Sequence, residues 1–152
     1  MTKIRNEVLV RRAPSEVFDE LSDPRSELQW NPKVERMVKL DDAPIGVGSR
    51  FRAKWKLSKE LTLTVTRYER PFGWAYTNDG PIVVDFDIDL HEHPDGTLLH
   101  ATFDASPKGV GWLFFPIFIV AIRREEKQNM GHLKRWLERH VPAQPMDDLA
   151  AE

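Results

Sequence analysis

The 152-residue sequence contains no cysteine. This excludes disulfides, a thiolate nucleophile and cysteine-ligated zinc, and it suits a reducing compartment, so we expect a cytoplasmic protein. Basic residues are not in excess either, because 22 Lys and Arg stand against 24 Asp and Glu and give a net charge of −2. Nucleic acid is therefore a poor partner, since no basic field attracts a phosphate backbone.

Long apolar runs are also missing. The most apolar stretch, GVGWLFFPIFIVAI at residues 109–122, is too short to span a bilayer, and Pro116 interrupts it. The N-terminal MTKIRNEVLVRR lacks the apolar core of a signal peptide. We expect a single domain at residues 1–141, followed by a disordered tail at 142–152, where prolines and acidic residues follow the last periodic pattern.

Alternating apolar and polar residues predict an antiparallel sheet with one buried face. The first strand is expected at residues 3–11, and two short helical segments are expected at 13–23 and 24–30. Further strands are expected from about residue 34 and at 48–58, 61–71, 72–80, 82–93 and 96–106, which makes about seven in all. The last two form a hairpin with the turn Asp95-Gly96. Such a sheet needs a cover on its apolar face.

The last hairpin has two chemically opposite faces. One face carries Asp85, Asp87, Asp89, His91, His93 and His100, and the other carries Phe86, Ile88, Leu90 and Phe103. A period of two forbids both sets from facing the core, so we expect the acids and histidines to face water. A surface metal site at His91, His93 and His100 is the alternative, but a catalytic metal also needs shelter and groups that orient its ligands. We expect neither a bound metal nor a cofactor.

Residues 111–140 are expected to form one long helix that covers the sheet. Its apolar stripe consists of Trp112, Phe115, Ile119, Ile122, Met130, Leu133 and Leu137. In the first half the opposite side is apolar as well, with Leu113, Phe114, Ile117, Val120 and Ala121. Such a patch is typical of a homodimer interface, a membrane-docking entrance, or burial under the loop at 108–111. A polybasic flank is missing beyond Arg123-Arg124, which favours a dimer or loop cover over transient membrane contact.

Four segments in this order resemble a known superfamily. They are VRRAPSEVFDELSDP, QWNPKV, the late PDGT turn, and QNMGHLKRWLE near the end. Together they are similar to the START-like superfamily, also called SRPBCC, and most closely to its polyketide cyclase/dehydrase branch. The resemblance covers nearly the whole chain and implies an α+β helix-grip fold, a curved antiparallel sheet around the C-terminal helix. It also implies a hydrophobic cavity for lipids, polyketides or other apolar ligands, but no transferable catalytic motif.

Two charged residues occupy positions on the apolar side. Continuing the alternation of the 61–71 strand puts Arg67 inward, and 100° per residue puts Glu126 in the stripe of the long helix. A lone buried charge is costly, so Glu126 should pair with Arg67 or reach water in the cavity. An exposed strand end and a register shift at Pro116 remain an alternative, and a bulge near Arg67 would instead turn Tyr68 inward. Tyr76 is a further inward hydrogen-bonding candidate.

The sequence thus predicts a protein that holds a hydrophobic or aromatic small molecule between the sheet and the long helix, as a non-catalytic carrier or sensor. The expected cavity residues are Phe51, Trp55, Leu63, Arg67, Trp74, Tyr76, Phe86, Ile88, Phe103, Phe115, Ile119, Ile122, Glu126 and Met130. The first alternative is a polyketide aromatase/cyclase-like enzyme with Arg67, Glu126 and Tyr76 as catalytic candidates. The second is a chaperone-activator-like or regulatory protein that uses the outer face of the helix start.

Overall fold

The computed structural model describes residues 2–139, so the expected tail at 142–152 lies outside the described residues. The chain begins with β1 (Thr2–Val10), α1 (Pro14–Leu21), the 3-10 turn η1 (Pro24–Ser26) and α2 (Glu27–Trp30). The strands β2 (Val34–Lys39), β3 (Arg50–Trp55), β4 (Leu61–Glu69), β5 (Gly73–Asn78), β6 (Ile82–His93) and β7 (Gly96–Pro107) follow. The long helix α3 (Gly111–Glu138) comes last.

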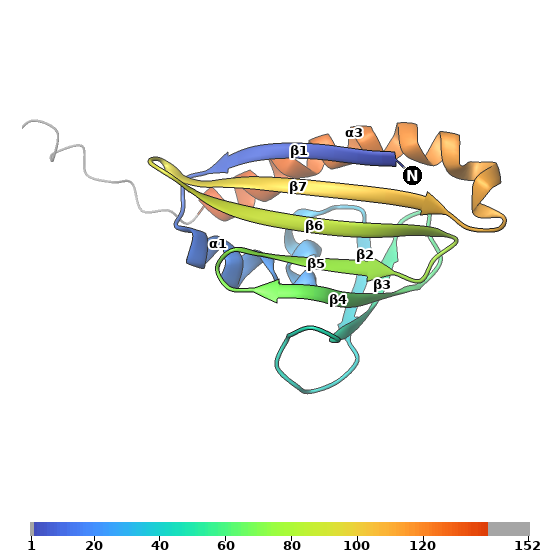
Figure 1. Ribbon diagram of the computed structural model, residues 1–152, viewed down its shortest axis with the longest axis horizontal. Coiled ribbons are helices and arrows are strands. Elements are labelled where there is room, and N and C mark those ends of the chain that lie inside the picture. The colour runs from blue at the N-terminus through green and yellow to red at the C-terminus, as the bar shows by residue number, and fades with distance from the viewer. Residues whose placement is uncertain (1, 140–152) are drawn as a thin grey trace, which may run out of the picture.

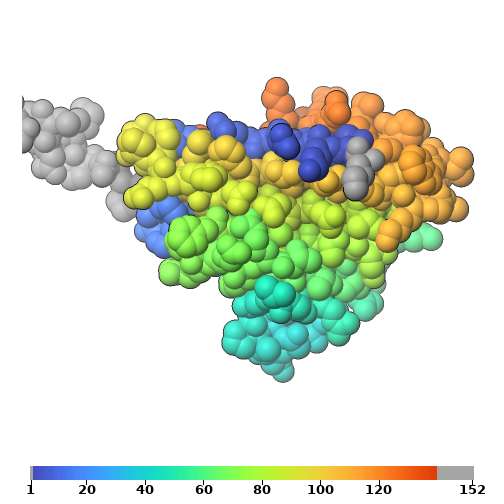
Figure 2. Space-filling model, in the orientation of Figure 1, coloured from blue at the N-terminus to red at the C-terminus, as the bar shows by residue number. Residues whose placement is uncertain are grey.

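The seven strands form one antiparallel sheet in the order β1-β7-β6-β5-β4-β3-β2. The helices lie on one face of this sheet, with α3 behind β1 and β7 in Figure 1. Figure 2 shows the opposite face of the sheet without a covering helix, and the segment between β2 and β3 projects from its lower edge. The α+β helix-grip architecture expected from the sequence is confirmed.

The β6–β7 hairpin has its polar face outward, but its turn differs from the expected one. His93 pairs with Gly96, so the turn residues are Pro94-Asp95 rather than Asp95-Gly96, and Asp89 pairs with His100. Proline is favoured at the second position of a four-residue turn and glycine at the fourth. Gly96 has a φ of +140°, and a Cβ there would lie 2.2 Å from the carbonyl oxygen of Val10. The shift in register equals two residues, so it leaves the inward and outward faces unchanged.

A β-bulge in β4 reverses the expected orientation of Arg67. The pairing with β5 shifts between Val65 and Arg67, and one extra residue exchanges the faces of everything that follows it. Arg67 therefore lies with the acidic residues of β6, which face away from the helices. Tyr68 turns inward instead and packs edge-on against Phe18 at 5.0 Å between ring centroids. The prediction of an inward Arg67 is wrong, and the alternative with a bulge is confirmed.

The main core lies between the sheet, α1 and the second half of α3. Its largest fully buried members from these elements include Phe18, Ile88, Leu99, Leu133 and Leu137. α1 begins with Pro14 at a position that suits a helix start and buries Val17, Phe18 and Leu21 on one side. The second half of α3 is thus fixed to the sheet by close packing.

The first half of α3 is much less buried. Leu113, Phe114, Ile117 and Val120 are 62 to 76% exposed, so the alternative in which the 108–111 loop covers them is wrong. Trp112, expected in the inward stripe, is 65% exposed as well. The helix continues through Pro116, its sixth residue, where the missing N–H removes one intrahelical hydrogen bond. No helix among residues 2–139 is apolar over a stretch long enough to cross a membrane.

Candidate functional site

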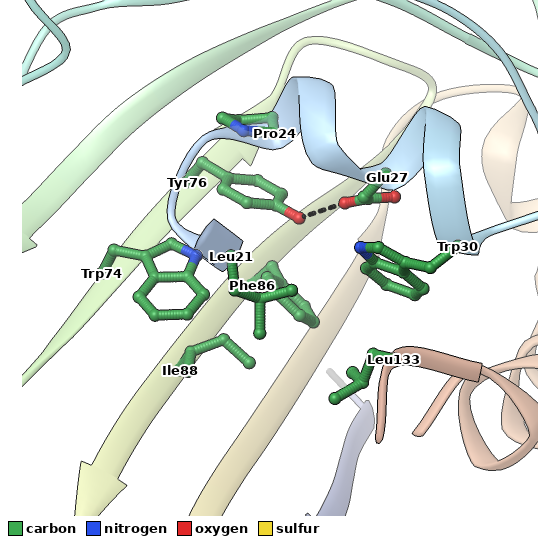
Figure 3. Close-up of a pocket in the computed structure, with 9 residues that line it drawn as sticks. All are labelled: Leu21, Pro24, Glu27, Trp30, Trp74, Tyr76, Phe86, Ile88 and Leu133. Carbon is green, nitrogen blue, oxygen red and sulfur yellow. Dashed lines mark hydrogen bonds between the residues drawn. The ribbon is translucent and has the colours of Figure 1, made fainter. Parts of the chain in front are cut away.

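A small cavity lies between the sheet, the short helical segments and α3. Figure 3 shows its lining, which is Leu21, Pro24, Glu27, Trp30, Trp74, Tyr76, Phe86, Ile88 and Leu133. Trp74 and Tyr76 come from β5, Phe86 and Ile88 from β6, and Leu133 from α3. The volume of about 20 Å³ is room for one water molecule. The lining is apolar except at one end, which is the usual pattern of a small-molecule site.

The polar end of the cavity is built on Glu27. The hydroxyl of Tyr76 donates a hydrogen bond of 2.9 Å to Oε1 of Glu27, and the side-chain amide of Asn31 donates one of 3.3 Å to Oε2. Burial raises the pKa of the Glu27 carboxyl, although both hydrogen bonds oppose the shift. Burial and the neighbouring Glu27 also raise the pKa of Tyr76 well above its ordinary value, so its hydroxyl keeps its proton and donates.

Glu126 of α3 is a second carboxyl in this region. Its side chain is half-buried in the inward stripe of the helix, as the sequence predicts. Burial is the main reason that the pKa of Glu126 rises from 4.5 to about 7, and the charge of Glu27 raises it further, whereas the amide of Asn129 opposes the shift. Glu126 also contributes to the high pKa of Tyr76. Tyr76, Glu27 and Glu126 therefore form one electrostatically coupled group.

Trp30 adds a hydrogen-bond donor to the same end. Its Nε1 is buried and has no hydrogen-bond partner within residues 2–139. Figure 3 shows this nitrogen on the side of the indole that faces the interior of the ring of lining residues, near the Glu27 carboxyl. Buried indole N–H groups normally have an acceptor. The cavity therefore presents a donor that protein atoms leave free.

Beyond Glu126, towards the start of α3, partly buried apolar residues pack between the helix and the sheet. The sheet contributes Ile82, Val84 and Phe86 around the buried Phe103, and the helix contributes Phe115, Phe118, Ile119 and Ile122. Phe103 and Phe118 lie 6.4 Å apart between ring centroids. We call these eight residues the apolar cluster, and Phe86, which also packs against Tyr76, connects it to the polar group of Glu126, Glu27 and Tyr76.

The structure divides the predicted cavity residues among several environments. Trp74, Tyr76, Phe86 and Ile88 line the small cavity. Phe103, Phe115, Ile119 and Ile122 lie in the apolar cluster, with Glu126 at its polar end. Met130 is in the main core, whereas Phe51 and Leu63 belong to a separate core under β2 to β4, with Trp55 half-buried against it.

Arg67 does not reach the cavity or Glu126. Its Nη2 donates to Oδ1 of Asp87 at 2.7 Å and to Oδ1 of Asp89 at 2.9 Å on the outer face. The prediction that Arg67 pairs with Glu126 is therefore wrong, because the bulge in β4 turns Arg67 to the outer face. Sequence reasoning missed Glu27 as a functional residue, because the four-residue helix α2 is too short to show a period. The only signal was Asn31, four residues after Glu27, which is the spacing of helical neighbours.

The histidines and acids of the last hairpin stay on the outer face. The rings of His91 and His100 lie 4.8 Å apart, and Nε2 of His100 is 3.2 Å from Oε2 of Glu7. Within the described part of the chain, no group of three or more His, Asp or Glu side chains is arranged to hold a metal ion. A wider surface hollow of about 320 Å³ lies elsewhere, among Asp19, Glu20, Asp23, Arg25, Ser26, Gln29 and Trp136. It is open, and every residue of its lining except Trp136 is polar or charged, unlike the lining of an apolar ligand site.

A comparison with protein families identifies the chain. The family described as "Polyketide cyclase / dehydrase and lipid transport" matches residues 1–138. The chain belongs to this family. Its description names polyketide cyclases and dehydrases together with lipid transport. A search of curated proteins finds no match by sequence.

Solved structures with the same fold are distant in sequence. Protein TTHA0849 from Thermus thermophilus has a TM-score of 0.75 at 13% identity, over 93% of this chain and 100% of that one. The Aha1 dimer from Colwellia psychrerythraea has a TM-score of 0.66 at 14% identity, over 91% and 97%. DynU16, of the dynemicin biosynthetic locus, has a TM-score of 0.65 at 20% identity, over 94% of this chain and 49% of that one. These similarities establish the fold.

Proposed function

We propose that the protein binds a hydrophobic or aromatic small molecule within the apolar cluster, between the sheet and the first half of α3, and acts as a non-catalytic carrier or sensor. The apolar part of the molecule lies between Phe103 and the first half of α3. Its other end points towards Glu126, Glu27 and Tyr76. Membership of a family that includes lipid transport proteins supports this proposal.

The observation that carries the proposal is the incomplete burial of apolar side chains that face one another. Phe86 on the sheet and Phe115, Ile119 and Ile122 on α3 belong to one cluster and yet stay partly exposed. Each would gain from further burial, at about 25 cal/mol for every Å² removed from water. An apolar ligand supplies that burial. Because the cavity holds about 20 Å³, the ligand must displace the first half of α3, which lacks the closely packed residues of the second half.

A carrier is favoured over an enzyme by the position of Arg67. Polarising a ketone for cyclisation calls for a cation or strong donor near the reacting oxygen. Arg67, the cationic candidate, is held by Asp87 and Asp89 on the outer face. The remaining groups of the site can bind and orient a ligand, but none of those that line the cavity is a cation.

Native mass spectrometry of protein purified without detergent tests the proposal. The expected result is an additional mass that denaturation releases, and that extraction identifies as an apolar compound. The released compound should rebind in a one-to-one ratio. A protein that carries no additional mass and takes up no apolar compound over a broad panel contradicts the proposal.

A second candidate, a polyketide cyclase-like enzyme, is supported by the coupled acids. The pKa of Glu126 at about 7 suits a general acid or base at neutral pH, and Tyr76 is a donor beside it. Similarity in fold to DynU16, a protein of a biosynthetic locus, agrees with this alternative. With an enzymatically generated poly-β-keto chain, Glu126→Gln should lower kcat far more than it changes KM. Equal effects on both would exclude a catalytic role.

We further propose a cytoplasmic location and self-association through the start of α3. The absence of cysteine agrees with a reducing compartment. The apolar face of Leu113, Phe114, Ile117 and Val120 stays 62 to 76% exposed, and exposed patches of this kind commonly mark interfaces. A second copy of the chain is the partner we propose, and a protein of the same fold, Aha1 from Colwellia psychrerythraea, has been solved as a dimer.

A further inference from the structure

The buried Nε1–H of Trp30 places a specific demand on any ligand of this site. An indole nitrogen can only donate, and this one has no acceptor within residues 2–139. Leaving a buried donor unsatisfied costs more than a normal hydrogen bond contributes. The oxygens of Glu27 accept from Tyr76 and Asn31, and neither accepts from Trp30. When a ligand fills the cavity, the acceptor for Trp30 is therefore expected to come from that molecule.

The charges around Trp30 restrict what that acceptor can be. Among the residues that line the cavity, Glu27 is the only ionisable acid and no lysine or arginine is present. Glu126 adds a second carboxyl close enough to interact with Glu27. A negatively charged ligand group here would meet like charges in a region of low dielectric constant and would find no cation. An uncharged oxygen avoids this repulsion and still accepts from Trp30.

We infer that the ligand carries an uncharged carbonyl oxygen at its buried end, and that the site rejects molecules that present a carboxylate there. This inference rests on the proposed function, because the inference specifies the polar end of the molecule that binds within the apolar cluster. The oxygen accepts a hydrogen bond from Nε1 of Trp30. Ketones, esters and lactones with an apolar body fit this description, and ionised fatty acids do not.

Three naphthalenes of nearly equal shape test the inference in the wild-type protein. They are 2-acetylnaphthalene, 2-isopropenylnaphthalene, in which CH₂ replaces the oxygen, and 2-naphthoate. Each competes at pH 7.5 with the uncharged fluorescent probe N-phenyl-1-naphthylamine. The ketone should bind about tenfold more tightly than the hydrocarbon, as one buried hydrogen bond provides, and 2-naphthoate should bind most weakly.

Two variants and one control variant locate the effect. Trp30→Phe should lower the affinity of the ketone to that of the hydrocarbon and leave the hydrocarbon unchanged. Trp55→Phe removes an indole that does not line the cavity, so it is the matched control and should keep the order of the three compounds. Glu27→Gln keeps the size of the side chain and should strengthen the binding of 2-naphthoate.

The outcomes separate the two proposals. If the probe and all three naphthalenes fail to bind, the proposed function and this inference both fail. If the hydrocarbon binds as tightly as the ketone, or 2-naphthoate binds most tightly, the inference is overturned while the proposed function stands. The comparison of the three compounds uses the wild-type protein, so the inference is tested even if Trp30→Phe does not fold. In that protein the ketone should also shift one indole N–H resonance in the NMR spectrum, and the absence of any such shift contradicts the inference.

Discussion

The hydroxyl of Tyr76 donates a 2.9 Å hydrogen bond to Oε1 of Glu27, joining β5 to α2 across 49 positions of sequence. This bond places a polar group at the end of an otherwise apolar cavity. Because Glu27 is buried, the bond also supplies part of the solvation that the carboxyl loses. The stability of the site and its ability to bind a polar ligand group therefore depend on the same two residues.

Removing the hydroxyl should destabilise the fold more than an equivalent change elsewhere. Tyr76→Phe leaves Oε1 of Glu27 without this donor, so the free energy of unfolding should fall by about 1 to 2 kcal/mol. Tyr68→Phe is the matched control, since its hydroxyl lies 3.3 Å from Oγ of Ser22 and has no charged partner in that contact. Urea denaturation of both variants measures the difference. Equal decreases in the free energy of unfolding of the two variants would show that the Tyr76 hydrogen bond stabilises the fold no more than the Tyr68 contact does.

Stability should depend on pH through Glu126. The pKa of Glu126 is about 7 in the fold and 4.5 is its ordinary value, so between these values the folded state holds more protons than the unfolded state. Stability from this group is complete below pH 4.5 and is lost as pH rises through 7, by about 2 to 3 kcal/mol. Glu126→Gln should remove most of this fall, and Glu27, with its pKa raised in the same direction, should leave a remainder. Urea unfolding from pH 4.5 to 8 measures both profiles, and parallel profiles would contradict the assignment.

Arg67 should matter for stability and not for ligand binding. Arg67→Met leaves Asp87 and Asp89 without their shared cation, so the free energy of unfolding should fall by about 1 to 2 kcal/mol. Arg70→Met breaks a more exposed pair with Asp19 and should lower the free energy of unfolding less than Arg67→Met does. The affinity for N-phenyl-1-naphthylamine should be unchanged in both variants. A large loss of affinity in Arg67→Met alone would place Arg67 in the site after all.

The exposed face of α3 should control self-association. Phe114 is 62% exposed, so Phe114→Asp places a charge in the proposed interface without disturbing the core. Light scattering should give the mass of a dimer for the wild type and of a monomer for the variant, with the same circular dichroism spectrum. Leu57→Asp changes a fully exposed residue between β3 and β4 and should leave the mass at that of the wild type. Identical masses for the wild type and Phe114→Asp would exclude this interface.

The sequence correctly predicted which way side chains face wherever the spacing of apolar residues repeats over a long segment. The alternation in β6 correctly placed Phe86 and Ile88 inward, and the period of the long helix correctly placed Glu126 on the side of the sheet. Trp112 was misplaced by the same rule, because a period gives the side of a helix and not how far the sheet extends beneath it. The family resemblance, confirmed over residues 1–138, supplied the way the helix and sheet come together.

The polar end of the site depends on features that no local pattern contains. A single extra residue in the bulge of β4 exchanged Arg67 and Tyr68, and alternation carries no information about where a bulge occurs. Glu27 lies in a helix of four residues, and its partner Tyr76 is on another element. Their meeting depends on tertiary packing of α2 against the open end of the sheet, so only the structure could reveal it.

The most direct test of ligand binding within the apolar cluster is a titration with N-phenyl-1-naphthylamine in two variants of one helix. Ile119 faces the sheet and is half-buried, whereas Ile117 is 74% exposed on the other side. The probe should bind to the wild type and to Ile117→Asp with similar affinity and increased fluorescence, and Ile119→Asp should weaken binding at least tenfold while remaining folded. Equal affinities for the two variants would contradict binding between the sheet and α3.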